Sequence, residues 1–188
     1  MKRAVFLDRD GVINEEVNYL SGPEQLRLIP GAPEAIARLN VANLPVIVIT
    51  NQAGVARGYY LETQIAVVHA ALSRELAQAG AYIDRYYYCP HHPTEGLPPY
   101  RVECDCRKPK PGLLLQAARD FDLDLAQCFV IGDNHSDIAL TQTAGCRAVL
   151  VLTGHGARVW REWQYDFQPD HVAPDLSAAV AWILEQLQ

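Results

Sequence analysis

The feature that most constrains the fold is an alternation of short apolar runs with longer amphipathic segments. Residues 4–7 and 45–50 are apolar or β-branched runs of the length of a buried strand, whereas residues 33–41 and 62–78 carry apolar positions at helical spacing. Strands that alternate with helices are joined by right-handed crossovers, which produces a mainly parallel sheet covered on both faces. The sequence therefore predicts a doubly wound α/β fold.

The same alternation continues to the end of the chain. We expect strands over 85–88, 128–131 and 148–152, helices over 112–121 and 137–144, and a terminal helix that Asp175 caps and that runs through Leu187. Residues 90–107 are rich in proline and polar groups, which predicts an irregular loop. A chain of 188 residues suits one domain of ordinary size, so we expect a single domain over residues 1–188.

Composition argues against several classes of protein. The net charge of −6 gives no basic face for nucleic acid, and no apolar run approaches the length of a membrane span. The N-terminal apolar run is too short for a signal peptide. Five cysteines in a chain without a secretion signal indicate a reducing compartment and favour metal binding over disulfides. We therefore expect a cytoplasmic protein with no nucleic-acid and no membrane partner.

Polar residues follow three of the predicted strands at their carboxyl ends. Asp8 ends the first strand, Thr50 the second, and Asp133 follows the strand over 128–131. Ligands of open α/β sheets bind beyond these ends, so three strands deliver polar side chains to one edge. Asp8 and Asp10 lie two residues apart, and carboxylates packed so closely need a cation beside them. Each segment alone also fits a solvated turn or a helix cap, but their order and placement together indicate a site.

This set of motifs resembles the haloacid-dehalogenase-type phosphatases. Those enzymes carry a DxD strand end, a Ser or Thr strand end, a Lys and an acidic GDxxxD segment. The matching residues here are Asp8-Arg9-Asp10-Gly11, Thr50, Lys108 and Gly132-Asp133-Asn134-His135-Ser136-Asp137. The resemblance covers the chain from Val5 to about Leu152 and implies a Rossmann-like haloacid-dehalogenase core.

The resemblance implies phosphoryl transfer through an aspartyl phosphate. Asp8 would be the nucleophile, and Asp10 would protonate the leaving oxygen and later deprotonate the attacking water. Lys108 would neutralise charge between Asp8 and the phosphoryl group. Thr50 and Asn51 would hydrogen-bond the phosphoryl oxygens and hold them in line.

Magnesium is the catalytic cofactor that the resemblance implies. Mg²⁺ is a hard cation that takes oxygen ligands, and the expected ligands are Asp8, the main-chain carbonyl of Asp10, and Asp133. Asp137 is expected to orient the loop rather than to bind the metal.

Two closely spaced pairs of ligands indicate a second metal site. Cys89-Pro90-His91 and Cys104-Asp105-Cys106 flank a loop with almost no apolar content. Three Cys and one His form a closed tetrahedral set that is typical of structural zinc. His92 competes with His91 as the fourth ligand, and the C-x-H spacing and the family pattern favour His91. We therefore expect a structural Zn²⁺ held by Cys89, His91, Cys104 and Cys106, in a loop over about 89–106.

The zinc loop narrows the resemblance within the family. A haloacid-dehalogenase core with this loop in place of a large cap domain resembles two subgroups of phosphatases. One acts on the 7-phosphate of D-glycero-D-manno-heptose 1,7-bisphosphate and the other on histidinol phosphate. The segment Cys106-Arg107-Lys108-Pro109-Lys110-Pro111-Gly112 is closer to the heptose subgroup, in which Arg-Lys-Pro-x-Pro-Gly follows the last zinc ligand. The implied partner is a small phosphorylated sugar, and a capless enzyme of this size suits a monomer.

The same resemblance implies which residues contact the sugar. Arg107 supplies a fixed guanidinium suited to the second phosphate of a bisphosphate. Asn134 stands where the heptose subgroup often carries Lys, and its amide can hydrogen-bond a substrate oxygen. The other residues expected to bind substrate are Glu16, Tyr19, Asn51, Gln52 and Ala53.

Two other classes of protein share part of this pattern. A phosphate-accepting receiver domain also places Asp, Thr and Lys at strand ends around Mg²⁺. Its phosphate acceptor lies on a middle strand, however, and it has no zinc loop. A zinc-stapled nucleic-acid module would need a basic stripe, which this acidic chain lacks. The sequence therefore favours a phosphatase.

Overall fold

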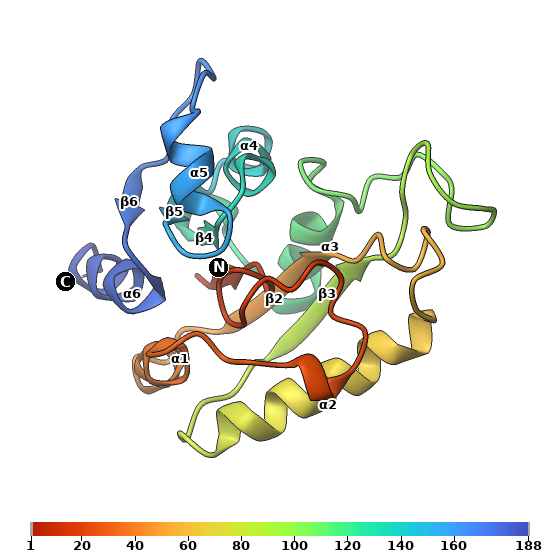
Figure 1. Ribbon diagram of the computed structural model, residues 1–188. Helices are drawn as coiled ribbons and strands as arrows, with labels where there is room; N and C mark the ends of the chain where they lie inside the picture. The colour runs from red at the N-terminus through yellow and green to blue at the C-terminus, as the bar shows by residue number, and fades with distance from the viewer. Residues whose placement is uncertain (1, 188) are drawn as a thin grey trace.

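A computed structural model describes residues 2–187, which surround one six-stranded sheet with helices on both faces (Figure 1). The strands are β1 (Val5–Leu7), β2 (Val46–Asn51), β3 (Arg85–Cys89), β4 (Phe129–Gly132), β5 (Arg147–Val151) and β6 (His171–Ala173). Their order in the sheet is β3-β2-β1-β4-β5-β6, and every neighbouring pair is parallel. The predicted doubly wound parallel sheet is confirmed.

The helices divide between the two faces according to the alternation of side chains along each strand. They are α1 (Ala32–Val41), α2 (Glu62–Ala77), α3 (Gly112–Phe121), α4 (His135–Ala144), α5 (Gly156–Arg161) and α6 (Leu176–Glu185). Short 3₁₀ turns cover Pro23–Gln25 and Leu125–Gln127. In β1, Val5 and Leu7 share a core with α1, α2 and α6, whereas Phe6 shares the opposite core with α3. Successive residues therefore anchor opposite layers.

Strand β1 occupies the position in the sheet that creates the site. It lies between β2 and β4, with Leu7 in register with Val48 on one side and Ile131 on the other. The chain runs from β1 outward through β2 to β3 and then crosses back to β4 on the other side of β1, which makes this edge the topological switch point where α/β proteins bind ligands. No separate cap domain interrupts residues 2–187, and none of their helices is long and apolar enough to cross a membrane.

Two elements near the C-terminus were not expected from the sequence. Helix α5 and strand β6 lie in the segment that carries the aromatic residues, and β6 is only three residues long. His171 of β6 stacks on Trp182 of α6, with ring centroids 4.7 Å apart. Trp163 and Phe167 pack against the small core of Ile138, Ala148 and Leu150, so these aromatic rings serve packing.

Helix α2 carries a buried histidine that is held in its neutral form. The ring of His69 stacks on Tyr86 of β3 with centroids 4.4 Å apart, and its Nε2 is buried without a hydrogen-bond partner among residues 2–187. Burial lowers the pKa of His69 to about 3, because the charged imidazolium would lose its hydration there. The unfolded chain, with an ordinary histidine pKa near 6.5, therefore binds this proton more readily than the folded chain.

We predict that His69 makes the protein acid-labile. Its contribution to stability is fully present above pH 6.5 and is lost as the pH falls toward the folded pKa of about 3. His69→Phe keeps the aromatic stack and should lose about 2 kcal/mol less free energy of unfolding than the wild type between pH 7.5 and pH 5. Urea titrations at both pH values measure this difference, and equal losses in the two proteins would contradict it.

Candidate active site

The ammonium of Lys108 forms the centre of a buried charge cluster at the ends of β1, β2 and β4. Its Nζ lies 3.0 Å from Asp8 Oδ1 and 2.6 Å from Asp137 Oδ1, and it donates to the carbonyl of Ile49 at 2.9 Å. The contacts with Asp8 and Asp137 are ion pairs, and the contact with Ile49 is a hydrogen bond to the backbone. Lys108 is only 4% exposed, so these interactions occur away from bulk water. The chain leaving the zinc loop thus meets both β1 and α4.

The carboxylates around Lys108 have strongly shifted acidities. Burial raises the pKa of Asp8 to about 7; Lys108 opposes this, and the carboxylates of Asp137 and Asp10 add to it. Burial and the neighbouring Asp8 and Asp137 raise the pKa of Asp133 to about 8. Burial alone would lower the pKa of Lys108, but Asp137 and Asp8 outweigh it and raise that pKa. One lysine does not balance three acidic groups, so the cluster favours a further cation.

The arrangement of the acidic residues fits a hard divalent cation such as Mg²⁺. Asp8, Asp133 and Asp137 each offer an oxygen, and these oxygens lie within 4.8 Å of one another. The backbone closes tightly on Asp133, since a Cβ added to Gly11 or Gly154 would lie 2.1 Å or 2.2 Å from its Oδ2. That same oxygen accepts the backbone N–H of residue 155 at 2.7 Å. Asp133 is thereby fixed with its carboxyl group toward Asp8.

Asp137 differs from the other two acids because the protein engages both of its oxygens. Oδ1 pairs with Lys108, and Oδ2 accepts the backbone N–H of Asn134 at 3.1 Å. The second contact belongs to the first turn of α4, where Asn134 is the N-cap residue. Asp137 therefore holds the loop after β4 and the lysine in a fixed relation.

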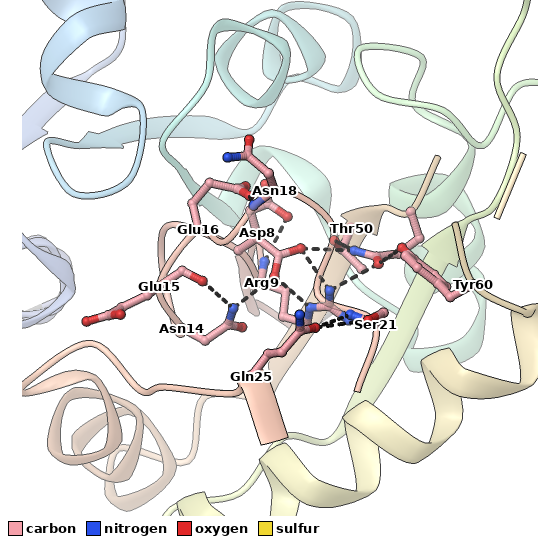
Figure 2. Close-up of polar contacts among 12 residues, drawn as sticks. Asp8, Arg9, Asn14, Glu15, Glu16, Asn18, Ser21, Gln25, Thr50 and Tyr60 are labelled. Atoms are coloured by element: carbon pink, nitrogen blue, oxygen red, sulfur yellow. Dashed lines mark hydrogen bonds and ion pairs between the residues drawn. The ribbon is translucent and has the colours of Figure 1, made fainter. Parts of the chain in front are cut away.

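Arg9, which the sequence did not single out, is buried and forms an ion pair with Asp10. Figure 2 shows Arg9 within the network of polar contacts next to Asp8. Its guanidinium, 1% exposed, donates to both oxygens of Asp10 at 3.1 Å and 2.9 Å, and to Gln52 at 3.0 Å. Burial would raise the pKa of Asp10, but Arg9, with hydrogen bonds from Asn14 and Gln52, outweighs it and lowers that pKa. Asp10 is consequently held in one orientation as a carboxylate.

The side chains of Gln52 and Asn51 form hydrogen bonds with other residues of the site. The Gln52 amide donates to Asp10 at 3.0 Å and to Thr50 at 2.9 Å, and its oxygen accepts from Arg9 and Tyr60. The Asn51 amide is hydrogen-bonded to the backbone N–H and carbonyl of Lys108 at 3.0 Å and 3.2 Å. Both side chains, which were expected to contact substrate, line the cavity and also hold Asp10 and the backbone of Lys108 in position.

A cavity of about 560 Å³ gathers the residues that the sequence pointed to. The expected residues that line it are Asp8, Asp10, Glu16, Tyr19, Thr50, Asn51, Gln52, Ala53, Arg107, Lys108, Asp133 and Asn134. Residues that line it without having been expected include Arg57, Tyr60, His135, Ser136 and His155. His155 follows β5, so the rule that polar residues gather beyond the strand ends could have found it.

The four residues expected to hold zinc converge in the loop after β3. Sγ of Cys104 lies 3.5 Å from that of Cys89 and 3.3 Å from that of Cys106. Nδ1 of His91 lies 3.4 Å from Cys106 Sγ and 3.8 Å from Cys89 Sγ. A tetrahedron with Zn–S bonds of about 2.3 Å has edges of about 3.8 Å, close to these separations. The cluster could therefore hold a tetrahedral metal ion.

The competing ligand, His92, turns away from this cluster. Its Nδ1 accepts the backbone N–H groups of Thr94 and Glu95 at 3.3 Å and 3.0 Å. The cysteine and histidine cluster also positions the wall of the cavity, because Arg107 donates to the carbonyl of His91 at 3.2 Å. Arg107 directly follows Cys106, so the end of this loop carries one guanidinium of the cavity.

The fold and the carboxylate cluster at the end of β1 define a haloacid dehalogenase-like hydrolase. Two family models agree, one for haloacid dehalogenase-like hydrolases over residues 5–82 and one for HAD-hydrolase-like proteins over residues 105–179. Over 189 residues the chain is 45% identical to the D-glycero-D-manno-heptose-1,7-bisphosphate 7-phosphatase of Thermosynechococcus vestitus, covering 98% of this chain and 96% of that protein.

Further relatives point the same way. The D-glycero-beta-D-manno-heptose-1,7-bisphosphate 7-phosphatase of Rhodopseudomonas palustris is 46% identical over 76% of this chain and 79% of its own. The crystal structure of D,D-heptose 1,7-bisphosphate phosphatase from B. bronchiseptica, complexed with magnesium and phosphate, superposes with a TM-score of 0.88 at 36% identity, covering 99% of both chains. The chain belongs to the D-glycero-D-manno-heptose-1,7-bisphosphate 7-phosphatase family.

We predict that Lys108 stabilises the fold through its buried ion pairs. Lys108→Met should lower the free energy of unfolding at pH 7.5 by about 3 kcal/mol, because it leaves Asp8 and Asp137 buried without their cation. Added Mg²⁺ should recover part of this loss by replacing the missing charge. Lys110→Met, at an exposed neighbouring lysine, is the control and should change little. Equal denaturant midpoints for the two variants would contradict the prediction.

Proposed function

We propose that this chain is a Mg²⁺-dependent phosphatase that removes the 7-phosphate of D-glycero-D-manno-heptose 1,7-bisphosphate. The observation that carries the proposal is the convergence of Asp8, Asp10, Lys108 and Asp133 on one cavity that also contains Arg107. Relatives that cover nearly the whole chain are named for this reaction.

Asp8 is the nucleophile in the proposed first step. Its carboxylate oxygen attacks the phosphorus atom, the bond from phosphorus to the sugar oxygen breaks, and the phosphoryl group remains on Asp8. Lys108, 3.0 Å from Asp8, offsets the repulsion between this anion and the phosphate. Thr50 can donate its hydroxyl proton to a phosphoryl oxygen, since its Oγ1 already accepts from Gln52.

Asp10 supplies and then recovers the proton. Asp10 must first take up a proton from solvent, because its hydrogen bonds from Arg9 and Gln52 lower its pKa and favour the carboxylate. It gives this proton to the departing sugar oxygen, which leaves as an alcohol, and in the second step takes one from the water that attacks the phosphoaspartate. That step breaks the bond between Asp8 and phosphorus and releases inorganic phosphate. Hydrogen bonds from Arg9, Asn14 and Gln52 hold the Asp10 carboxylate in place for both transfers.

The carboxylates of Asp8 and Asp133 and the main-chain carbonyl of Asp10 would hold the Mg²⁺. When bound, the ion offsets the charge of the carboxylates and of the phosphate. Asp137 keeps its structural role, because both of its oxygens are already engaged.

Zinc is the proposed occupant of the second metal site. Three thiol sulfurs and one imidazole nitrogen form a closed donor set with no protein ligand missing, which is typical of a structural Zn²⁺. Such a metal stabilises a loop that has little apolar surface of its own. It would also fix Arg107, whose guanidinium bonds the carbonyl of the ligand His91, as the group for the distal 1-phosphate.

The substrate-binding roles of the remaining residues rest on their position in the cavity. Glu16, Tyr19 and Ala53 line it, and Asn134 lies at the start of α4 next to Asp133. We propose that Asn134 and Glu16 hydrogen-bond hydroxyl groups of the sugar. Asn51 and Gln52 contribute by holding Lys108 and Asp10 in position.

We infer that residues 1–188 act as one domain and that the enzyme is a monomer in the cytoplasm. The continuous six-stranded sheet supports the single domain. The five free cysteines support a reducing compartment.

The first test compares phosphate release from heptose 1,7-bisphosphate and from histidinol phosphate with Mg²⁺. We predict a kcat/KM at least about 100-fold higher for the heptose ester, because histidinol phosphate has no second phosphate to pair with Arg107. Asp8→Asn should abolish turnover while leaving the fold intact, as circular dichroism would show, and the exposed Asp166→Asn should match the wild type in turnover. A preference for histidinol phosphate would assign the other subgroup. Activity retained by Asp8→Asn would remove it as the nucleophile.

The zinc proposal predicts linked losses of metal and stability. Cys104→Ala should reduce bound zinc from one ion per chain and lower the melting temperature, because the loop loses its anchor. Cys146→Ala, a buried cysteine outside the cluster, should keep its zinc. Elemental analysis and thermal unfolding measure both effects. One zinc per chain in the Cys104→Ala protein would rule out this set of ligands.

A further inference from the structure

The tip of the zinc loop rests on the turn that follows β2. Gly96 of the loop has a φ of +87°, and a Cβ at this position would lie 1.7 Å from the carbonyl oxygen of Ala56. Only glycine permits both this conformation and this close backbone approach. The turn in contact with the loop carries Arg57, which lines the active-site cavity. Loop and turn also lie side by side in Figure 1.

The zinc loop is anchored to the core on its other side. The Glu62 carboxylate, at the start of α2, accepts the hydroxyl of Tyr100 at 2.7 Å and that of Tyr88 at 3.0 Å. Tyr100 belongs to the loop and Tyr88 to β3, so one carboxylate links both. His92 accepts two backbone N–H groups of the tip and thereby fixes the segment that carries Glu95.

Arg57 is held at the cavity by two partners that leave part of its guanidinium unused. Its Nη1 forms an ion pair with Glu95 of the loop tip, and its guanidinium lies over the ring of Tyr19, 5.7 Å from the centroid. Its Nε is buried without a hydrogen-bond partner among residues 2–187. The side chain of Glu95 is 48% exposed and that of Arg57 is 26% exposed. The Glu95 carboxylate can therefore separate from Arg57 and become solvated, while the guanidinium remains at the cavity.

We propose that Arg57 is a second specificity residue, which exchanges the Glu95 carboxylate for the distal phosphate of a sugar bisphosphate. This rests on the proposed function and extends it. Arg57 and Arg107 both line the cavity, and a phosphate dianion accepts charge-assisted hydrogen bonds from two guanidinium groups. A monophosphate lacks that anion and leaves Arg57 paired with Glu95. The ring of Tyr19 keeps the guanidinium over the cavity in both states.

The test measures kcat and KM for heptose 1,7-bisphosphate and heptose 7-phosphate. Arg57→Met should lower kcat/KM for the bisphosphate by about tenfold, mainly through KM, and that for the monophosphate by less than about twofold. Arg101→Met, at an exposed arginine of the same loop, should match the wild type on both esters. Equal losses of the Arg57 variant on the two esters, or no loss on either, would overturn the inference.

Glu95→Gln tests the exchange itself. Removing the competing carboxylate should lower KM for the bisphosphate several-fold and leave the monophosphate unchanged. A higher KM for both esters would show that the ion pair only fastens the loop, and would overturn the exchange. A wild-type enzyme with no preference for the bisphosphate would instead contradict the proposed function, and with it this inference, before any variant is compared.

Discussion

The buried ammonium of Lys108 is the interaction on which the rest of the site depends. Burying a charged group costs several kcal/mol unless partners replace its lost hydration, and here Asp8, Asp137 and the Ile49 carbonyl do so together. These partners come from the ends of β1 and β2 and from the first turn of α4. The parallel sheet brings those ends to one edge, so the charge cluster depends on the order of the strands. The Lys108 ammonium in turn favours the ionised form of Asp8, because it opposes the rise in pKa that burial causes.

The zinc loop is coupled to that cluster through the backbone. The chain passes from Cys106 directly into Arg107 and Lys108, and the Asn51 side chain of β2 forms two hydrogen bonds with the backbone of Lys108. A disturbance of the loop would therefore reach the lysine as well as the cavity wall. A segment with almost no apolar content can shape the cavity in this way because its cysteine and histidine side chains converge and the sheet holds the chain that follows them.

Much of this could be read from the sequence because the signals were local. The apolar runs that became β1, β2 and β4 end directly before Asp8, within a residue of Thr50, and before Asp133, and the spacing of Cys89, His91, Cys104 and Cys106 is a short pattern. What could not be read depends on contacts between distant segments. Strand β6 is three residues long and pairs only with β5. Arg9 resembles a surface residue in the sequence, and only the fold shows it 1% exposed against Asp10. The place of Arg57 in the cavity follows from the turn after β2 and its contact with the zinc loop.

We propose that Asp8 carries the phosphoryl group during turnover, with Lys108 beside it. Mass spectrometry of enzyme quenched in acid during turnover of heptose 1,7-bisphosphate with Mg²⁺ tests this. We predict a phosphorylated peptide that contains residues 5–11, with the modification on Asp8, and its absence from the Asp8→Asn protein. A phosphoryl group on another residue, or turnover without any phosphorylated Asp8 peptide, would contradict it.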